Sequence, residues 1–80
     1  MAQMLYREFR FFSPVLGRRA ARISSSDKMG GEYFAIVPMD GGSAVNKERR
    51  EAALEAIDAA IRAGRDPGEV EVPEENRTLH

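Results

Sequence analysis

The sequence predicts an α+β domain, in which a small antiparallel sheet of three to four strands packs on one helix in the order β-β-β-α-β. Three observations lead to this fold class. Residues 43–64 have the spacing of an amphipathic helix, residues 4–39 contain aromatic and β-branched segments separated by turn residues, and residues 69–72 alternate glutamate with valine. A chain of 80 residues is long enough for one domain and too short for two.

The helix is the most clearly patterned segment. Its apolar residues recur at spacings of three and four, which places them on one stripe; they are Ala53, Leu54, Ile57, Ala60 and Ile61. Ser43 or Asn46 can cap the N-terminal end, and Gly64 with Pro67 ends the helix. Because the stripe is narrow and built from small residues, we expect the helix to pack closely on the sheet, with Ile57 and Ile61 buried against residues 33–37.

Four strands are expected around this helix. Residues 4–12 alternate apolar with polar side chains, residues 32–39 are the most apolar stretch, and residues 69–72 suit an edge strand with its valines inward. Residues 18–25 leave two alternatives open. They form the second strand of a hairpin after a turn at residues 13–17, or a helical turn forms at residues 18–22, since alanine and arginine favour helix. We expect residues 1–72 to form the single domain and residues 73–80 to be a flexible acidic tail.

The composition argues against several classes of function. The chain has no cysteine, which excludes disulfides and thiolate metal sites, and its only histidine is the last residue, His80. We therefore expect no catalytic residue, cofactor, metal site or small-molecule substrate, and predict that the protein is not an enzyme. Charged residues interrupt every apolar run, so we expect no signal peptide, no membrane contact and a cytoplasmic location.

The charges are unevenly distributed along the chain. Residues 1–28 carry six basic and two acidic side chains, whereas residues 29–80 carry six basic and eleven acidic ones. Five arginines of the basic half are candidate contacts for a protein partner or a nucleic acid: Arg7, Arg10, Arg18, Arg19 and Arg22. Four rings lie among them, and exposed rings can stack on bases: Tyr6, Phe9, Phe11 and Phe12. We expect instead that these rings belong to the core, because the rest of the chain has few large apolar residues.

The connection between the apolar strand and the helix reads Asp-Gly-Gly-Ser at residues 40–43. Such a segment can hold an anion at the helix N-terminus, or it can be a plain strand-to-helix turn in which glycine relaxes the backbone. It lacks the glycine spacing and the Gly-Lys-Ser/Thr core of a nucleotide-binding loop. We therefore favour the turn.

These observations together predict a small non-catalytic protein–protein interaction or regulatory module. An 80-residue chain without disulfides or metals has a marginal core, so a homodimer is expected, and the partner is a protein or a second copy of this chain. The alternative is a nucleic-acid-binding protein that uses the arginine-rich N-terminal half.

Overall fold

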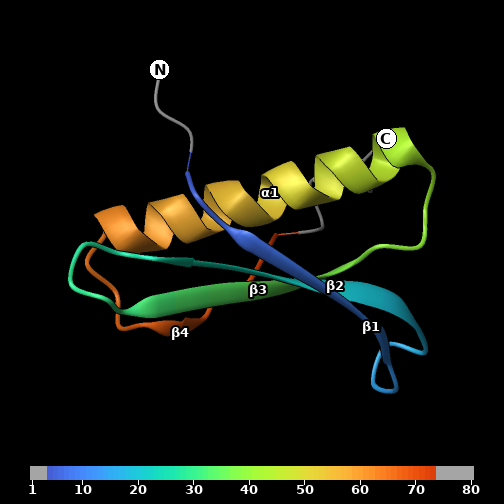
Figure 1. Ribbon diagram of the computed structural model, residues 1–80, viewed down its shortest axis with the longest axis horizontal. Coiled ribbons are helices and arrows are strands. Elements are labelled where there is room, and N and C mark those ends of the chain that lie inside the picture. Colours follow the sequence, from blue (N-terminus) through green and yellow to red (C-terminus); the bar gives the residue numbers. More distant parts are fainter. Residues whose placement is uncertain (1–3, 74–80) are drawn as a thin grey trace.

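The computed structural model describes residues 4–73 and contains four strands and one helix (Figure 1). In chain order these are β1 (Arg7–Ser13), β2 (Arg18–Ser26), β3 (Glu32–Pro38), α1 (Ser43–Arg62) and β4 (Gly68–Glu69). The predicted α+β fold and its β-β-β-α-β order are confirmed. Most of the predicted acidic tail, residues 74–80, lies outside the described residues.

The four strands form one sheet in the order β1-β2-β3-β4. β1 pairs antiparallel with β2, and β2 pairs antiparallel with β3. The short β4 runs parallel to β3, so the sheet is mixed rather than purely antiparallel. The connection explains this direction, because a helix that crosses back over the sheet brings the next strand in parallel to the previous one.

The segment that the sequence left open, residues 18–25, is a strand. β2 lies between β1 and β3 and forms ladders with both, so its backbone groups find partners along both edges. If residues 18–22 formed a helical turn instead, the backbone N–H and C=O groups of β1 and β3 that now bond to these residues would lose their hydrogen-bond partners. Long-range pairing therefore overrides the local preference of alanine and arginine for helix.

The core lies between α1 and one side of the sheet. Side chains of a strand alternate between its two faces, and the register places Ala21 opposite Val37 and Ile23 opposite Ala35. These four residues are buried against the helical stripe together with Tyr33 and Met39, and the stripe contributes Ala53, Ile57 and Ala60. The predicted packing is confirmed for Ile57, which is fully buried, whereas Ile61 is only half-buried at the margin of the core.

The ends of α1 differ partly from the prediction. Gly42 is the N-cap and provides no side-chain hydrogen bond, whereas Ser43 and Asn46 were the expected caps. Asn46 lies inside the helix, where its Oδ1 accepts a hydrogen bond of 3.0 Å from the backbone N–H of Gly41. At the other end Gly64 adopts φ +71° and its N–H donates to the carbonyl of Ile61, as expected for a glycine stop.

The helix covers only part of the sheet. Within residues 4–73, α1 packs over β3 and, to a smaller extent, β2, and its contact with β1 is an ion pair between side chains. The expectation that the N-terminal rings belong to the core is therefore wrong for most of them. Phe9 and Phe12 keep 66% and 59% of their surface exposed, Tyr6 is also exposed, and Phe11 is half-buried. Phe9 and Phe11 lie on the side of the sheet away from α1, whereas Phe12 lies on the helix side of a third strand that the narrow stripe does not cover.

Candidate functional site

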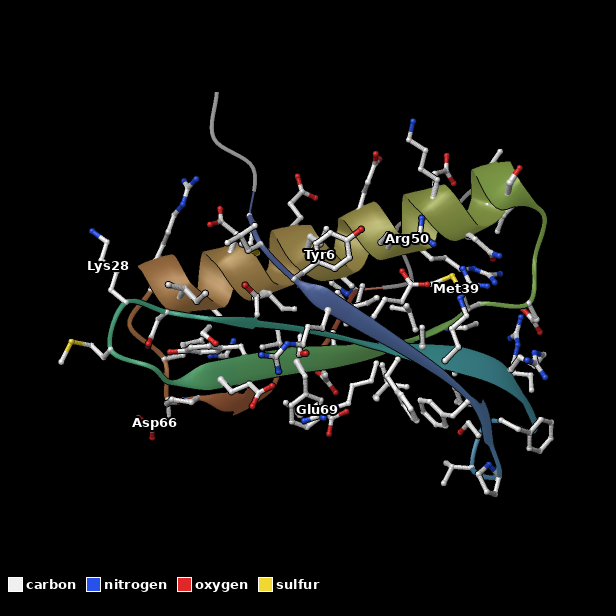
Figure 2. The ribbon with its side chains drawn as sticks, viewed as in Figure 1. Tyr6, Lys28, Met39, Arg50, Asp66 and Glu69 are labelled. Carbon is white, nitrogen blue, oxygen red and sulfur yellow. The ribbon has the colours of Figure 1, made fainter. Side chains whose placement is uncertain are left out.

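The side of the sheet opposite α1 carries no covering element among residues 4–73, and we call it the open face. Alternation along the three paired strands defines its members: Arg7, Phe9, Phe11, Ala20, Arg22, Ser24, Phe34 and Ile36. Figure 2 shows Glu69 of β4 pointing away from α1 toward this side, whereas Tyr6 and Arg50 lie on the helix side. Large apolar and basic side chains therefore share one surface without a helix above it.

Aromatic rings dominate the open face along β1. The rings of Phe9 and Phe11 are stacked, with centroids 6.1 Å apart and planes inclined by 19°. Ala20 lies opposite Phe11 in the register and is only 1% exposed. Larger side chains around Ala20 therefore cover it. The apolar surface that remains exposed to solvent consists mainly of the Phe9 ring.

A guanidinium lies over an aromatic ring on the second part of this surface. The Cζ of Arg22 is 4.2 Å from the centroid of the Phe34 ring, which is the geometry of a cation–π contact. Arg22 is half-buried, and its side chain makes no hydrogen bond or ion pair with any residue in the described range 4–73. The Phe34 ring therefore positions the guanidinium, and its N–H groups can donate to an acceptor from another molecule.

The apolar surface continues into the β1–β2 hairpin. Beyond β1, the turn exposes Val15, which is 92% accessible, and Leu16, whose N–H is held by the hydroxyl of Ser13 at 3.1 Å. Phe12 is exposed at the same end, on the helix side of the sheet beyond the helix itself. Several exposed apolar side chains at one end of the sheet are compatible with a protein-binding surface there.

The five candidate arginines do not form one patch. Arg7, Arg18 and Arg22 lie on the open-face side, whereas Arg10 and Arg19 lie on the helix side. Arg18 forms a two-point ion pair with Asp40, at 2.9 and 3.1 Å, and the Nε of Arg10 lies 2.8 Å from Glu8. Two of the five positive charges are thus matched by carboxylates of the chain itself.

The connection at residues 40–43 is organised by Asp40 rather than by a bound anion. Its carboxylate accepts hydrogen bonds from Arg18 and, at 3.1 Å, from Arg49 of α1. The Arg18 guanidinium, helped by Arg49, lowers the pKa of Asp40 from its ordinary value of 3.8 to about 2. A carboxylate occupies the place where an anion site would need positive charge, which agrees with the strand-to-helix turn.

A second ion pair fastens β1 to the helix. The Nε of Arg50 lies 2.6 Å from one oxygen of Glu8, and its Nη2 lies 3.3 Å from the other. The Arg50 hydrogen bond lowers the pKa of Glu8 below its ordinary value, against the opposing effect of burial. Sequence reasoning missed this pair, because the two residues are 42 positions apart and no local pattern connects them.

Other classes of site have little support in the described residues. Residues 4–73 contain no group of three or more histidine, cysteine or acidic side chains arranged to hold a metal ion. In that same part of the chain, no helix has the length and apolar character needed to cross a bilayer.

Comparison with known proteins does not add a functional assignment. The chain matches no protein-family model, no curated protein and no solved structure. The function is therefore argued from the open face and its neighbours alone.

Proposed function

We propose that this chain is a non-catalytic protein-interaction module whose binding surface is the open face. The observation that carries the proposal is the contact of Arg22, a half-buried residue, with the Phe34 ring: its guanidinium lies over the ring, has no acceptor among residues 4–73 and is beside the exposed ring of Phe9. Arginine and aromatic side chains are the residue types enriched where protein interfaces gain most of their affinity.

The partner chemistry follows from the same residues. The register places Arg22 between Phe9 and Ile36, so a positive group is surrounded by apolar side chains. A complementary surface is apolar and places one Asp or Glu where it accepts hydrogen bonds from Arg22. Such a charge-assisted contact, desolvated by the surrounding rings, would set the orientation of the partner as well as its affinity.

Nucleic-acid binding is the alternative, and rings beside arginines on a sheet are compatible with it. Phosphate binding gains affinity from each positive charge that is free to neutralise a phosphate. Here Arg10 and Arg18 are already matched by Glu8 and Asp40, and Arg19 lies on the other side of the sheet. Residues 29–80 carry six basic and eleven acidic side chains, and this acidic excess opposes the approach of a polyanion. These features favour a protein partner.

The test compares the parent with Arg22→Glu. The tagged parent chain is incubated with an extract of the source cells, and a protein that it retains is then purified and titrated against both chains by calorimetry. We expect Arg22→Glu to weaken binding by roughly tenfold or more, because it places like charge opposite the partner carboxylate. Val45→Ser, an exposed change on α1, is the matched control and should leave the affinity unchanged.

The alternative is tested on the same proteins by filter binding with mixed-sequence DNA and RNA at two salt concentrations. Binding to either nucleic acid that falls steeply with salt and is lost in an Arg7/Arg22 double alanine variant would replace the protein-binding proposal. A directly binding protein that is indifferent to Arg22→Glu would also contradict the assignment of the open face.

A further inference from the structure

The outer edge of β1 is an unpaired strand edge within residues 4–73. β1 is the first strand of the sheet, runs for seven residues and contains no proline, lysine or bulge that would discourage pairing with another chain. Met39 donates its N–H to the carbonyl of Arg19, so the backbone of Arg19 faces β3. N–H and C=O groups of one residue point to the same side of an antiparallel strand. Phe12, which is opposite Arg19, therefore turns its backbone groups to the outer edge.

The same alternation gives the outer edge of β1 a defined set of donors and acceptors. Glu8, Arg10 and Phe12 direct their N–H and C=O groups outward, whereas Phe9 and Phe11 direct theirs to β2. A second copy of β1 can pair antiparallel with this edge only in registers that place outward-facing residues opposite one another. Three registers that pair at least five residues of β1 meet this condition, with their twofold axes at Phe9, at Arg10 or at Phe11.

The charges distinguish between these registers. An axis at Arg10 places Arg10 opposite itself and so opposes like charges directly, and an axis at Phe11 places Arg10 opposite Phe12 and pairs no charges. An axis at Phe9 places Glu8 opposite Arg10 of the second copy, and the reverse pair follows by symmetry. Glu8 and Arg10 already form an ion pair within each chain, and Glu8 also binds Arg50, so this register joins two existing pairs into one network of alternating charges.

The aromatic residues complement one another in the same register. On the open-face side, Phe9 meets Phe9 of the second copy, and Arg7 meets Phe11. On the helix side, Tyr6 meets Phe12, and both rings are exposed in the single chain. Cross-strand aromatic and cation–aromatic pairs stabilise a sheet. α1 packs on β3 and β2 and contacts β1 through the Arg50–Glu8 ion pair, and β1 remains the edge strand of the sheet.

We infer that two copies of this chain pair through their β1 edges, antiparallel and with the twofold axis at Phe9, to form one continuous eight-stranded sheet. The occupant of this edge is thus a second copy, selected by the Glu8–Arg10 charge pairs and by the rings that flank them. The inference concerns the edge of β1 and does not depend on the binding of another protein to the open face.

The charge pairs allow a test by complementary variants. Arg10→Glu gives a strand with two acidic residues on this edge, and Glu8→Arg gives a strand with two arginines. In sedimentation experiments over a wide concentration range, the parent should reach twice the chain mass of 8.9 kDa. Each variant alone should dissociate at concentrations at least tenfold higher than the parent. An equimolar mixture should restore the dimer, because every position on the edge then faces an opposite charge.

Three further proteins make the result decisive. Arg19→Glu is the matched control, since it reverses an exposed charge on β2 away from the edge and should leave the dimer intact. Glu8→Arg also removes the bond to Arg50, so circular dichroism must show that it folds. If Glu8→Arg does not fold, Arg10→Pro is used in its place. Proline at position 10 removes only an N–H that points outward, so the hydrogen bonds between β1 and β2 are kept. A folded Arg10→Pro chain should be monomeric. Arg22→Glu, on the open face, should remain dimeric.

The inference is overturned by any of four outcomes. The parent is monomeric at every concentration, or folded Arg10→Glu dimerises like the parent. Equally, a mixture of the two folded charge variants stays monomeric, or Arg22→Glu dissociates a dimer that Arg10→Pro leaves intact. The last result would place self-association on the open face instead of the edge.

Discussion

Replacing Ile57 by alanine tests the packing of α1 on the sheet. The Ile57 side chain is 0% exposed and is among the largest fully buried ones. The substitution removes three carbon atoms and leaves a cavity, and buried Ile→Ala changes cost about 2–5 kcal/mol depending on how far the surroundings collapse. Many of the neighbours in this core are themselves alanines on β2, β3 and α1. Such short side chains cannot move into the cavity, so we expect about 3–5 kcal/mol, the upper part of that range.

This loss is large for so small a domain. At about 0.05–0.15 kcal/mol per residue, the whole chain has a free energy of unfolding of about 4–12 kcal/mol. For a domain of this size each kcal/mol corresponds to roughly 4–8 °C in melting temperature, so Ile57→Ala should melt at least about 12 °C below the parent or be unfolded at room temperature.

The assay is urea and thermal unfolding followed by far-ultraviolet circular dichroism, with all proteins at one concentration because self-association shifts apparent stability. Ile61→Ala serves as the first comparison, and its half-buried side chain predicts a smaller loss. Val45→Ala is the second, since this exposed residue should change the stability by no more than about 0.5 kcal/mol. If Ile57→Ala melts within a few degrees of the parent, or if Ile61→Ala costs more, the core does not lie where the structure has it.

Three further changes give independent outcomes. Gly31→Ala should destabilise the fold by about 1–3 kcal/mol in urea unfolding, because its Cβ would lie 2.6 Å from the Pro67 side chain; a neutral result would mean that this contact yields freely. Gly42→Ser should raise stability by roughly 0.2–0.4 kcal/mol, because a serine at the unfilled N-cap can accept a helical N–H and its Cβ meets nothing within 4 Å. Acid should destabilise the protein as the pH falls from 3.8 toward 2, since Asp40 has a lower pKa when folded and loses its favourable interactions on protonation. The melting temperature of Asp40→Asn should therefore depend less on pH in that window, and an unchanged pH profile would argue against the Asp40 ion pairs.

The elements that the sequence predicts best are those with strong local patterns. α1 and β3 were predicted within two residues of their observed ends, because a narrow apolar stripe and a dense apolar run each favour one structure. The residues of β2 allow both a strand and a helical turn, because alanine and arginine favour helix. Only the pairing of β2 with two neighbouring strands decides in favour of the strand. The direction of β4 likewise depends on the path of the chain over the sheet rather than on its own residues.

The candidate site was predicted only in part, for a different reason. Alternation along β1 separates two faces but does not say which face a helix will cover, or whether the helix reaches that strand at all. The exposure of Phe9 and Phe12 therefore followed only from the position of α1. Arg18 and Arg10 were predicted as partner contacts, whereas the structure joins them to Asp40 and Glu8. The contact between Arg22 and Phe34 joins two strands and has no signature in either segment.

The two proposed surfaces are geometrically linked. A twofold axis through Phe9, perpendicular to the sheet, keeps each side chain on its own side, so both open faces lie on the same side of the eight-stranded sheet. The two Phe9 rings then meet at the centre, flanked by one Arg22 from each copy, because Arg22 is the β2 neighbour of Phe9. A partner that is itself twofold symmetric would place one carboxylate on each Arg22 and bury both Phe9 rings at once. Pairing of the edges would thus convert two small aromatic surfaces into one larger interface, in which the second contact costs no further loss of translational freedom.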